Sequence, residues 1–205
     1  MKITEALESI KQNSKEKFDS TIEIHINFSS DAAGQVKNLR YTTSLPFGSG
    51  KKQKIATLAS KKIKGADLEL SEDDIKKIGS GELKPKADFD IVVSEPKFMS
   101  KLAKVAKILG PAGAMPNPKL GTVTEDVEKA VAELIKGKVE IKTEKEAPIV
   151  HTTIGKLSLS TKDLQKNFEA LMGSIQNNKP AKTKQNWIRS VYITSSMGKS
   201  VKVDL

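Results

Sequence analysis

The chain has 205 residues, enough for one large domain or two small ones that each bury a hydrophobic core. Its net charge of +10 favours an acidic partner, with nucleic acid ahead of a membrane surface. The lack of cysteine excludes disulfide frameworks, thiolate metal sites and thiol catalysis. No apolar run approaches the roughly 18 residues that span a bilayer, and the first residues lack an apolar signal core, so we expect a cytoplasmic protein with no membrane partner.

Positive charge is gathered in two blocks of the sequence. Residues 51–64 contain six lysines and no acid, and residues 179–205 contain six basic residues and one acid. Between them, residues 66–95 carry nine carboxylates against four lysines. Because solvated surfaces usually mix the two signs, the blocks suggest one basic face that folding brings together. The alternative is that both blocks are ordinary exposed lysines.

The first segment predicts a helix followed by two strands. Apolar residues recur at helical spacing over Ile3–Ile10, with Thr4 as the expected cap. Residues 22–28 alternate apolar and polar side chains, which predicts a half-buried strand. Residues 36–45 predict a second strand, which we expect to pair back on the first after a turn. Proline and glycine in residues 46–50 break this strand and mark a candidate domain boundary.

After this break, strands alternate with helices. Ser71, followed by Asp74 three residues later, resembles a capping box, and Thr124 is the expected cap of a later helix. A short apolar run after Asp90 is typical of a strand buried on both faces. The middle of the chain therefore predicts a small α/β domain with an open sheet. Its expected elements are strands over residues 54–58, 66–70 and 90–94, and helices over residues 71–78, 97–109 and 125–136.

The loop over residues 108–123 lies between the last two of these helices. It contains three of the chain's eight prolines and three of its thirteen glycines. Proline fixes φ and removes an N–H donor, whereas glycine allows backbone angles that other residues resist. We therefore expect a shaped loop whose backbone follows one path. Its simplest interpretation is a rigid connector between two helices.

Beyond Gly137, which we expect to cap the preceding helix in a left-handed conformation, β character returns. Residues 139–141 and 149–154 predict a hairpin, and a helix begins near residue 161 and stops at residues 177–180. Two final strands are expected over residues 187–195 and 201–203.

The two outer segments share a β-rich character that the middle lacks. We therefore expect a discontinuous α+β domain formed by residues 1–48 and 138–205, with a three-layer α/β open-sheet domain, residues 49–137, inserted into it. Where the chain crosses between these domains, we expect a hinge at Phe47, Gly48 and Gly137.

Side chains that suggest catalysis are few. His25 and His151 are the only histidines, each within a strand pattern, and no spacing of histidine with carboxylates predicts a metal site. The run from Gly48 to Lys52 is similar to the end of a phosphate-binding loop, but Leu45 stands where that motif needs its first glycine. We expect no catalytic residue, cofactor or metal, and no enzyme activity.

Four ordered segments resemble one known family. Residues 109–123 resemble its signature Leu-Gly-Pro-x-Gly-x-Met-Pro-Asn-Pro-Lys-x-Gly-Thr-Val. Residues 40–51 resemble its stretch ending in Leu-Pro-His-Gly-x-Gly-Lys, and residues 151–156 its His-x-x-Ile/Val-Gly-Lys segment. Residues 193–198 resemble its Ser/Thr-Thr-Met-Gly turn. On these matches the chain resembles the bacterial-type ribosomal protein L-one family, from the large-subunit stalk beside the tRNA exit site.

The resemblance implies a cytoplasmic, ribosome-associated protein whose discontinuous domain binds stalk rRNA of the large subunit. It also implies that the protein assists release of deacylated tRNA from the exit site and represses its own mRNA by binding the leader. We expect a monomer when the protein is free. Carried over by position, the expected RNA-binding residues are Lys17, Phe18, Thr21, Glu23, Lys156, Ser196, Met197 and Gly198.

These residue types suit RNA, which proteins recognise largely by shape, through 2′-hydroxyls and phosphates. Thr21 and Ser196 can bond to sugars, and Glu23 can accept a hydrogen bond from a 2′-hydroxyl or a guanine edge. Phe18 and Met197 offer apolar contact, although packing at strand ends is the structural alternative for both. Phosphate contacts are further expected from Lys17, Lys182 and Lys184.

Three residues depart from the family pattern. Phe47 replaces a usual histidine, Ala112 replaces a usual basic residue, and Lys199 stands where proline is expected.

Two other classes of function are considered. A dedicated translational repressor would not co-sediment with large subunits, and a small-molecule-binding α/β enzyme would show a thermal shift with nucleotides.

Overall fold

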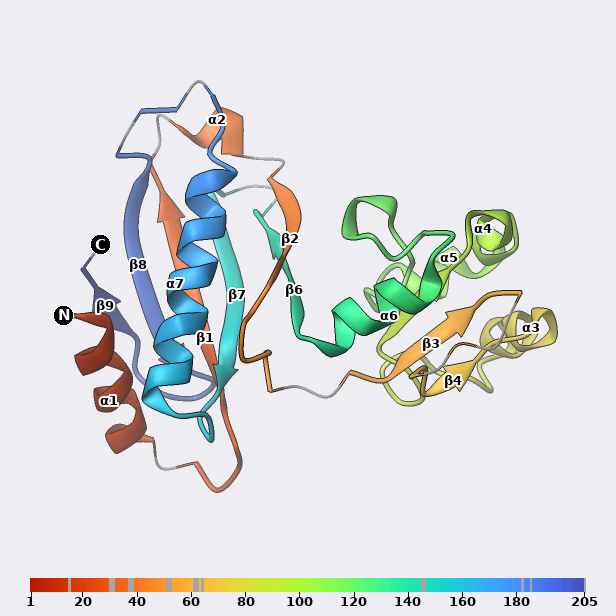
Figure 1. Ribbon diagram of the computed structural model, residues 1–205, viewed down its shortest axis with the longest axis horizontal. Coiled ribbons are helices and arrows are strands. Elements are labelled where there is room, and N and C mark those ends of the chain that lie inside the picture. The colour runs from red at the N-terminus through yellow and green to blue at the C-terminus, as the bar shows by residue number, and fades with distance from the viewer. Residues whose placement is uncertain are drawn as a thin grey trace. The chain divides into compact units, whose positions relative to one another are not determined.

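A computed structural model gives the fold of the chain (Figure 1). It describes residues 1–14, 16–29, 32–36, 39–50, 53–60, 63, 65–144, 147–181, 183–184 and 186–204. The chain is mixed α and β, and its described strands form three sheets. Backbone contacts divide it into two compact units, which we call the outer unit, residues 1–51 and 136–205, and the middle unit, residues 52–135. None of the helices in the described ranges has the length and apolar character to cross a membrane.

The outer unit is built on a four-stranded antiparallel sheet (Figure 1). The first of its strands alternates buried and half-buried residues along its whole length, as the alternation of apolar and polar side chains predicted. The strands, in spatial order, are β7 (Ile149–Lys156), β1 (Thr21–Phe28), β8 (Ile188–Ser195) and β9 (Val201–Val203).

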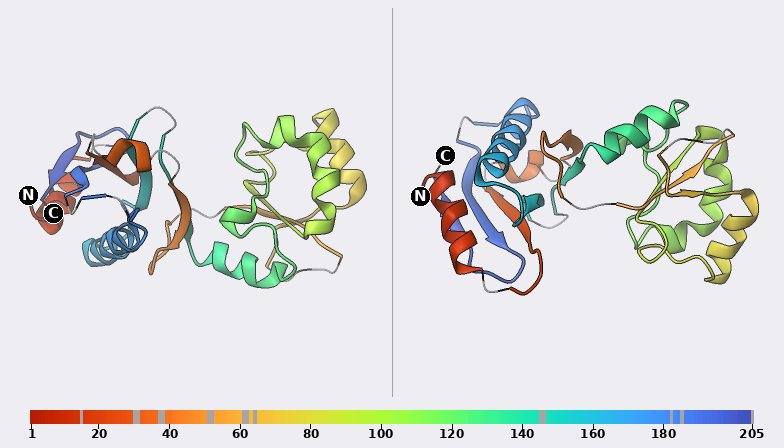
Figure 2. Two further views of the ribbon diagram at one scale, coloured as in Figure 1. Left: turned by 90° about the horizontal axis from the view of Figure 1, so that it is seen from above. Right: turned by 60° about the horizontal axis from the view of Figure 1, so that its bottom comes forward.

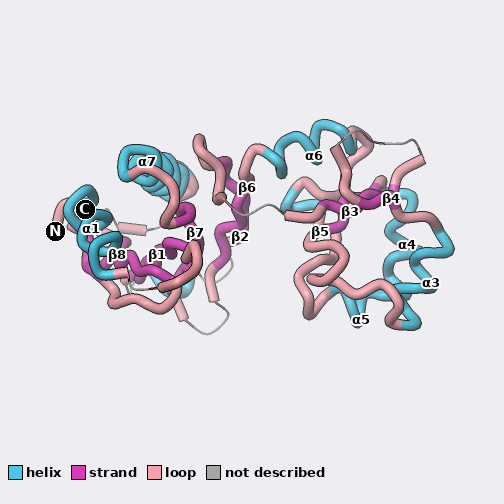
Figure 3. The backbone as a smooth tube through the Cα atoms, turned by 90° about the horizontal axis from the view of Figure 1, so that it is seen from below, coloured by secondary structure: helices cyan, strands magenta, loops and turns pink. Residues whose placement is uncertain are grey.

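Two helices, α1 (Ile3–Asn13) and α7 (Thr161–Asn177), pack on one face of this sheet (Figures 1 and 3). The predicted Thr4 cap is wrong, because α1 begins at Ile3 and Lys2 occupies the cap position, where its N–H donates to the Glu5 carboxylate at 3.4 Å. Figure 2 shows the two termini close together. There the amino group of Met1 lies 2.7 Å from the carboxylate of Asp204.

The core of the outer unit draws on both of its segments. The ring of Phe28 stacks on the buried ring of Trp187, with centroids 4.8 Å apart and planes 19° apart. Because apolar burial is the main favourable term in folding, neither segment has a complete core without the other. Fully buried members of this core include Leu7, Ile22, Ile24, Ile26 and Leu45 from the first segment, and Ile154, Leu164, Leu171, Trp187, Val191 and Ile193 from the second.

The second predicted strand does not pair as expected. Residues Ala33–Val36 form the short helix α2, and β2 (Arg40–Ser44) pairs with β6 (Lys138–Lys142) in a separate two-stranded sheet. It does not pair with β1, because β7 and β8 already occupy both edges of that strand. The expected hairpin after Gly137 is likewise reduced: among the described residues, an isolated antiparallel bridge joins Thr143, just after β6, to Val150 in β7.

The middle unit has a parallel sheet with helices on both faces. Its strands lie in the order β4 (Leu68–Glu69), β3 (Ile55–Leu58) and β5 (Ile91–Ser94). Val92 packs with α3 (Glu72–Ser80), α4 (Met99–Leu102) and α5 (Ala106–Leu109) on one face, and Val93 packs with α6 (Val127–Ile135) on the other. The prediction of a strand buried on both faces is confirmed.

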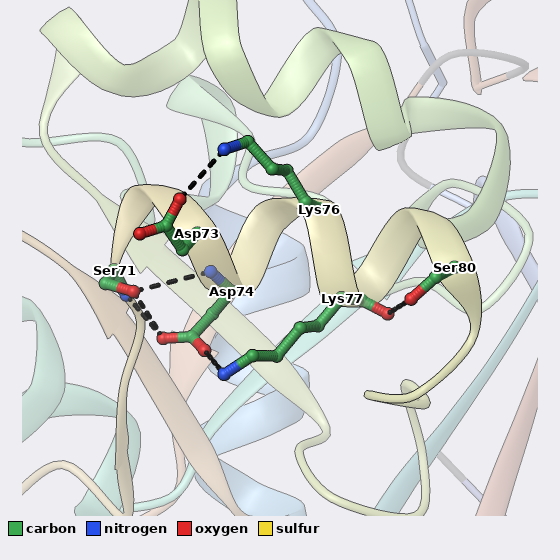
Figure 4. Close-up of polar contacts among 6 residues, drawn as sticks. All are labelled: Ser71, Asp73, Asp74, Lys76, Lys77 and Ser80. Carbon is green, nitrogen blue, oxygen red and sulfur yellow. Dashed lines mark hydrogen bonds and ion pairs between the residues drawn. The ribbon is translucent and has the colours of Figure 1, made fainter.

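The predicted capping box of α3 is present (Figure 4). The N–H of Asp74 donates to the Ser71 hydroxyl at 3.4 Å, and the N–H of Ser71 donates to the Asp74 carboxylate at 2.9 Å. Lys77 donates to the same carboxylate at 2.8 Å. The hydrogen bonds from Lys77 and then Ser71 lower the pKa of Asp74 to about 2. The helix ends where Gly81 adopts φ 84°.

Two other helix predictions in the middle unit need correction. The helix expected over residues 97–109 is divided into short α and 3-10 segments, although Leu102, Val105 and Leu109 are buried as predicted. Apolar residues spaced by three and four positions suit both kinds of turn, so the pattern could not distinguish them. The helix α6 begins at Val127, and Asp126 rather than Thr124 accepts an N–H of its first turn.

The loop over residues 108–123 follows the free edge of β5. The N–H of Val92 donates to Ala114 at 3.2 Å, and the N–H of Ser94 donates to Thr122 at 3.0 Å. Gly113 and Gly121 adopt φ 70° and 69°. The loop is therefore shaped, as predicted, and it also satisfies backbone groups that an edge strand would leave unpaired.

Candidate nucleic-acid interface

A cleft of about 800 Å³ opens in the outer unit where its two segments meet. Four of the predicted RNA-binding residues, Lys17, Phe18, Met197 and Gly198, line it, although about 180 residues of sequence separate the two pairs. Helix α1, the segment after it, the turn after β8 and the start of β9 supply the walls. The lining residues are Ser9, Ile10, Asn13, Glu16, Lys17, Phe18, Ser195, Met197, Gly198, Lys199 and Val201.

Two large apolar side chains in this cleft are open to solvent. Phe18 is 52% exposed and Met197 is 78% exposed. The alternative that both pack at strand ends is therefore wrong. Single exposed apolar residues are common, but two that line one hollow offer contact to a ligand. A flat ring and a pliable thioether suit bases and sugars.

Hydrogen bonds tie the start of β1 to the turn after β8. The N–H of Thr21 donates to the Ser196 hydroxyl at 3.2 Å, and that hydroxyl lies 3.3 Å from the Thr21 carbonyl oxygen. Glu23 lies opposite Thr194 in the β1–β8 register. The predicted residues Thr21, Glu23 and Ser196 thus lie beside those that line the cleft.

Lys156 lies on the other neighbour of β1, where it pairs with Thr21 in the β1–β7 register. Its ammonium group donates to the carbonyl oxygen of Asp19 at 2.9 Å. Ser158 holds the Asp19 carboxylate through its N–H at 3.0 Å and its hydroxyl at 2.9 Å. Lys156 therefore supports the segment that carries Phe18 but does not line the cleft.

Gly198 lies against the side chain of Ser195. A Cβ added there would lie 2.2 Å from the Ser195 hydroxyl oxygen, closer than real Cβ contacts come. The Gly198 carbonyl accepts a hydrogen bond from the Thr194 hydroxyl at 3.1 Å. Glycine is needed in this turn for a close approach within the chain, whatever the cleft binds.

Sequence reasoning missed Glu16. Its carboxylate accepts hydrogen bonds from the Ser14 hydroxyl at 2.6 Å and from the Ser195 hydroxyl at 3.0 Å. Hydrogen bonding to this carboxylate, led by the bond from Ser14, lowers the pKa of Glu16 below its usual value. From the sequence alone, an acidic residue between two lysines is interpreted as an ordinary exposed charge. The helix residues Ser9, Ile10 and Asn13 were missed because nothing in a helical pattern marks the rim of a cleft.

The predicted hinge residues do not line the cleft, and two of them, Phe47 and Gly48, contact α7. The buried Asn167 accepts the N–H of Phe47 at 3.0 Å and donates to the carbonyl of Gly48 at 3.0 Å. Gly48 and Gly137 adopt φ 67° and 91°, and a Cβ on Gly137 would lie 2.4 Å from the Gly48 Cα. The left-handed conformation predicted for Gly137 is confirmed.

Lysines 17 and 199 are the basic residues that line the cleft within the described part of the chain. Lys182, a predicted phosphate contact, lies outside the described residues. The same holds for the lysines at 51, 52, 61, 62 and 64, so the proposed meeting of the two basic blocks is not described.

The two histidines face each other across β1 and β7. Their Nδ1 atoms lie 2.6 Å apart, and the rings meet edge to face. Burial, followed by the charge of His151, lowers the pKa of His25. Across the described ranges, no group of three or more histidines and carboxylates is placed to hold a metal ion.

Comparison with known proteins decides the family. A model of the Ribosomal protein L1p/L10e family matches residues 10–199. The chain belongs to this family. The large ribosomal subunit protein uL1 of Prochlorococcus marinus strain MIT 9312 is 43% identical over 207 aligned residues, which cover 98% of this chain and 86% of that protein. The uL1 proteins of strains NATL1A and MIT 9515 are 43% and 42% identical over the same shares.

Membership of the L1p/L10e family confirms the resemblance drawn from four motifs. The family is one of ribosomal proteins, and this member is not an enzyme. The matched residues 10–199 include every predicted RNA-binding position and most of the cleft lining.

Proposed function

We propose that this L1p/L10e family member is a structural constituent of the large ribosomal subunit that binds stalk rRNA through the cleft of the outer unit. The observation that carries the proposal is the convergence of Phe18 and Met197, from opposite ends of the sequence, on one hollow with Lys17. Relatives named as large ribosomal subunit proteins support the ribosomal assignment.

The chemistry of the cleft suits a folded RNA. Lys17 and Lys199 neutralise phosphates, and each phosphate contact steepens the salt dependence of binding by somewhat under one unit on the B-DNA scale. The hydroxyl of Ser196 and the carboxylate of Glu23 bond to 2′-hydroxyls or base edges. Exposed apolar groups pack on sugars and bases, so recognition depends on shape more than on sequence.

We further propose that the outer unit is the rRNA-binding domain and that the middle unit is an α/β domain inserted into it. Phe47, Gly48 and Gly137 belong to the outer unit and lie close in sequence to the points where the chain leaves and re-enters it, and we assign the hinge to them. The middle unit would assist the release of deacylated tRNA from the exit site. The protein acts in the cytoplasm on ribosomes and is a monomer when free.

The same surface accounts for repression of the protein's own mRNA. A cleft that reads shape binds any RNA that presents the same fold, including a mimic in the mRNA leader. The free protein therefore binds the leader when rRNA is saturated. The alternative, a dedicated repressor that is not stably ribosomal, predicts that the protein stays off large subunits in a sedimentation experiment.

The substitution Met197→Asp tests the site. It places a negative charge beside the phosphates and removes apolar contact, so we expect stalk rRNA affinity to fall by at least about tenfold, or 1.4 kcal/mol. Filter-binding titrations at several salt concentrations give the affinity. Gly173→Asp, which adds the same charge to an exposed position of α7 with open space around it, is the matched control. Equal affinity of the two variants would remove the site assignment.

A further inference from the structure

Glu16 places a negative charge in a cleft proposed to bind a polyanion. The residue lines the cleft beside Lys17 and Phe18. Through water, two like charges about 4 Å apart repel by roughly 1 kcal/mol. On charge alone, Glu16 would weaken RNA binding, and its removal would strengthen it.

The hydrogen bonds of this carboxylate join the two segments that form the cleft. One oxygen accepts from Ser14, directly after α1, and the other accepts from Ser195, the last residue of β8. The first segment carries Lys17 and Phe18, and the second leads into the turn with Met197. One side chain therefore links the two walls that Phe18 and Met197 occupy.

The bond to Ser195 also bears on the shape of the turn. Ser195 is 2% exposed, and the space beside its hydroxyl is filled by the close approach of Gly198. The N–H of Gly198 donates to the Ser195 carbonyl at 3.1 Å. The Ser195 hydroxyl therefore lies against Gly198 in the turn that carries Met197, and the hydrogen bond to Glu16 holds that hydroxyl in its present rotamer.

We propose that Glu16 is a positioning residue, whose carboxylate holds the two walls of the cleft at the spacing that RNA requires. Its net effect on RNA affinity is favourable despite its charge, because the geometric contribution outweighs the repulsion. This inference rests on the proposed rRNA-binding function. The Glu16 carboxyl is ionised at neutral pH, its lowered pKa keeps it charged in more acidic solution, and an ionised carboxylate accepts the stronger hydrogen bonds.

The experiment compares stalk rRNA affinity among full-length variants. Glu16→Ala loses both hydrogen bonds, and we expect affinity to fall about tenfold. Glu16→Gln removes the charge but keeps an amide oxygen that can accept from Ser195, so it recovers most of the affinity. Glu8→Ala, which removes an acid from an exposed position of α1, is the matched charge control and binds as the parent chain does or slightly more tightly.

A double-mutant cycle with Ser195→Ala separates positioning from general destabilisation. If Glu16 acts through Ser195, the double variant Glu16→Ala with Ser195→Ala binds no more weakly than Glu16→Ala alone. Thermal unfolding midpoints, measured for each variant, are expected to move little. Equal or tighter binding by Glu16→Ala, or additive losses in the cycle, would overturn the inference. A parent chain that fails to bind stalk rRNA at all would instead refute the proposed function, and this inference with it.

Discussion

Single residues differ in how far their roles can be read from sequence. Glycine at 137 was predicted to be left-handed from its place after a helix, and its φ is 91°. The close approach between Gly137 and Gly48 was not predicted, because these two residues are far apart in the sequence and come together only when the chain folds. Glu16 was missed for the same reason, since its partner Ser195 lies 179 positions away.

Gly137→Ala is predicted to destabilise the protein strongly. A side chain at positive φ costs roughly 1–3 kcal/mol, and the added Cβ would also meet the Gly48 backbone at 2.4 Å. Gly173→Ala is the control, because Gly173 lies within α7 and a Cβ there has nothing within 4 Å. That change is expected to stabilise by about 0.5–1 kcal/mol. Urea unfolding of both variants gives the two free energies, and equal values would contradict the account.

Helices and strands whose sequence pattern is local were predicted well, whereas the pairing of strands was not. Period-two alternation predicted β1, and helical spacing predicted α7 with its buried face. The partner of β2 could not be predicted, because alternation marks a strand but does not say which edge is vacant. The cleft needed the family resemblance as well, since Phe18 and Met197 read in isolation as buried packing residues.

The histidine pair across β1 and β7 predicts a pH dependence of stability. Burial and the nearby His151 lower the pKa of His25 in the folded chain, so the unfolded chain binds this proton more readily. The free energy of unfolding therefore falls as pH drops below about 6.5, the usual histidine value, towards the lower folded pKa. His25→Gln should make this slope shallower between about pH 5 and 7. Chemical denaturation across that range measures it, and identical slopes would disprove the prediction.

At the scale of the whole molecule, the two ends of the sequence form one core and one cleft. Buried residues from residues 6–45 and 141–203 make a single cluster, and the middle unit has clusters of its own. A unit with its own core is expected to fold without the segment inserted into it. The rRNA-binding proposal therefore predicts that the middle unit can be removed without loss of most of the affinity.

The most direct measurement is the affinity for stalk rRNA of a spliced chain compared with the full chain. Because the backbones of Gly48 and Gly137 lie in contact, a short glycine linker can replace residues 49–136. Circular dichroism and a cooperative melt would first establish that the spliced chain folds. We predict that it keeps affinity within about tenfold of the full chain, or 1.4 kcal/mol. A folded spliced chain that no longer binds stalk rRNA would contradict the claim that the cleft of the outer unit is the binding site.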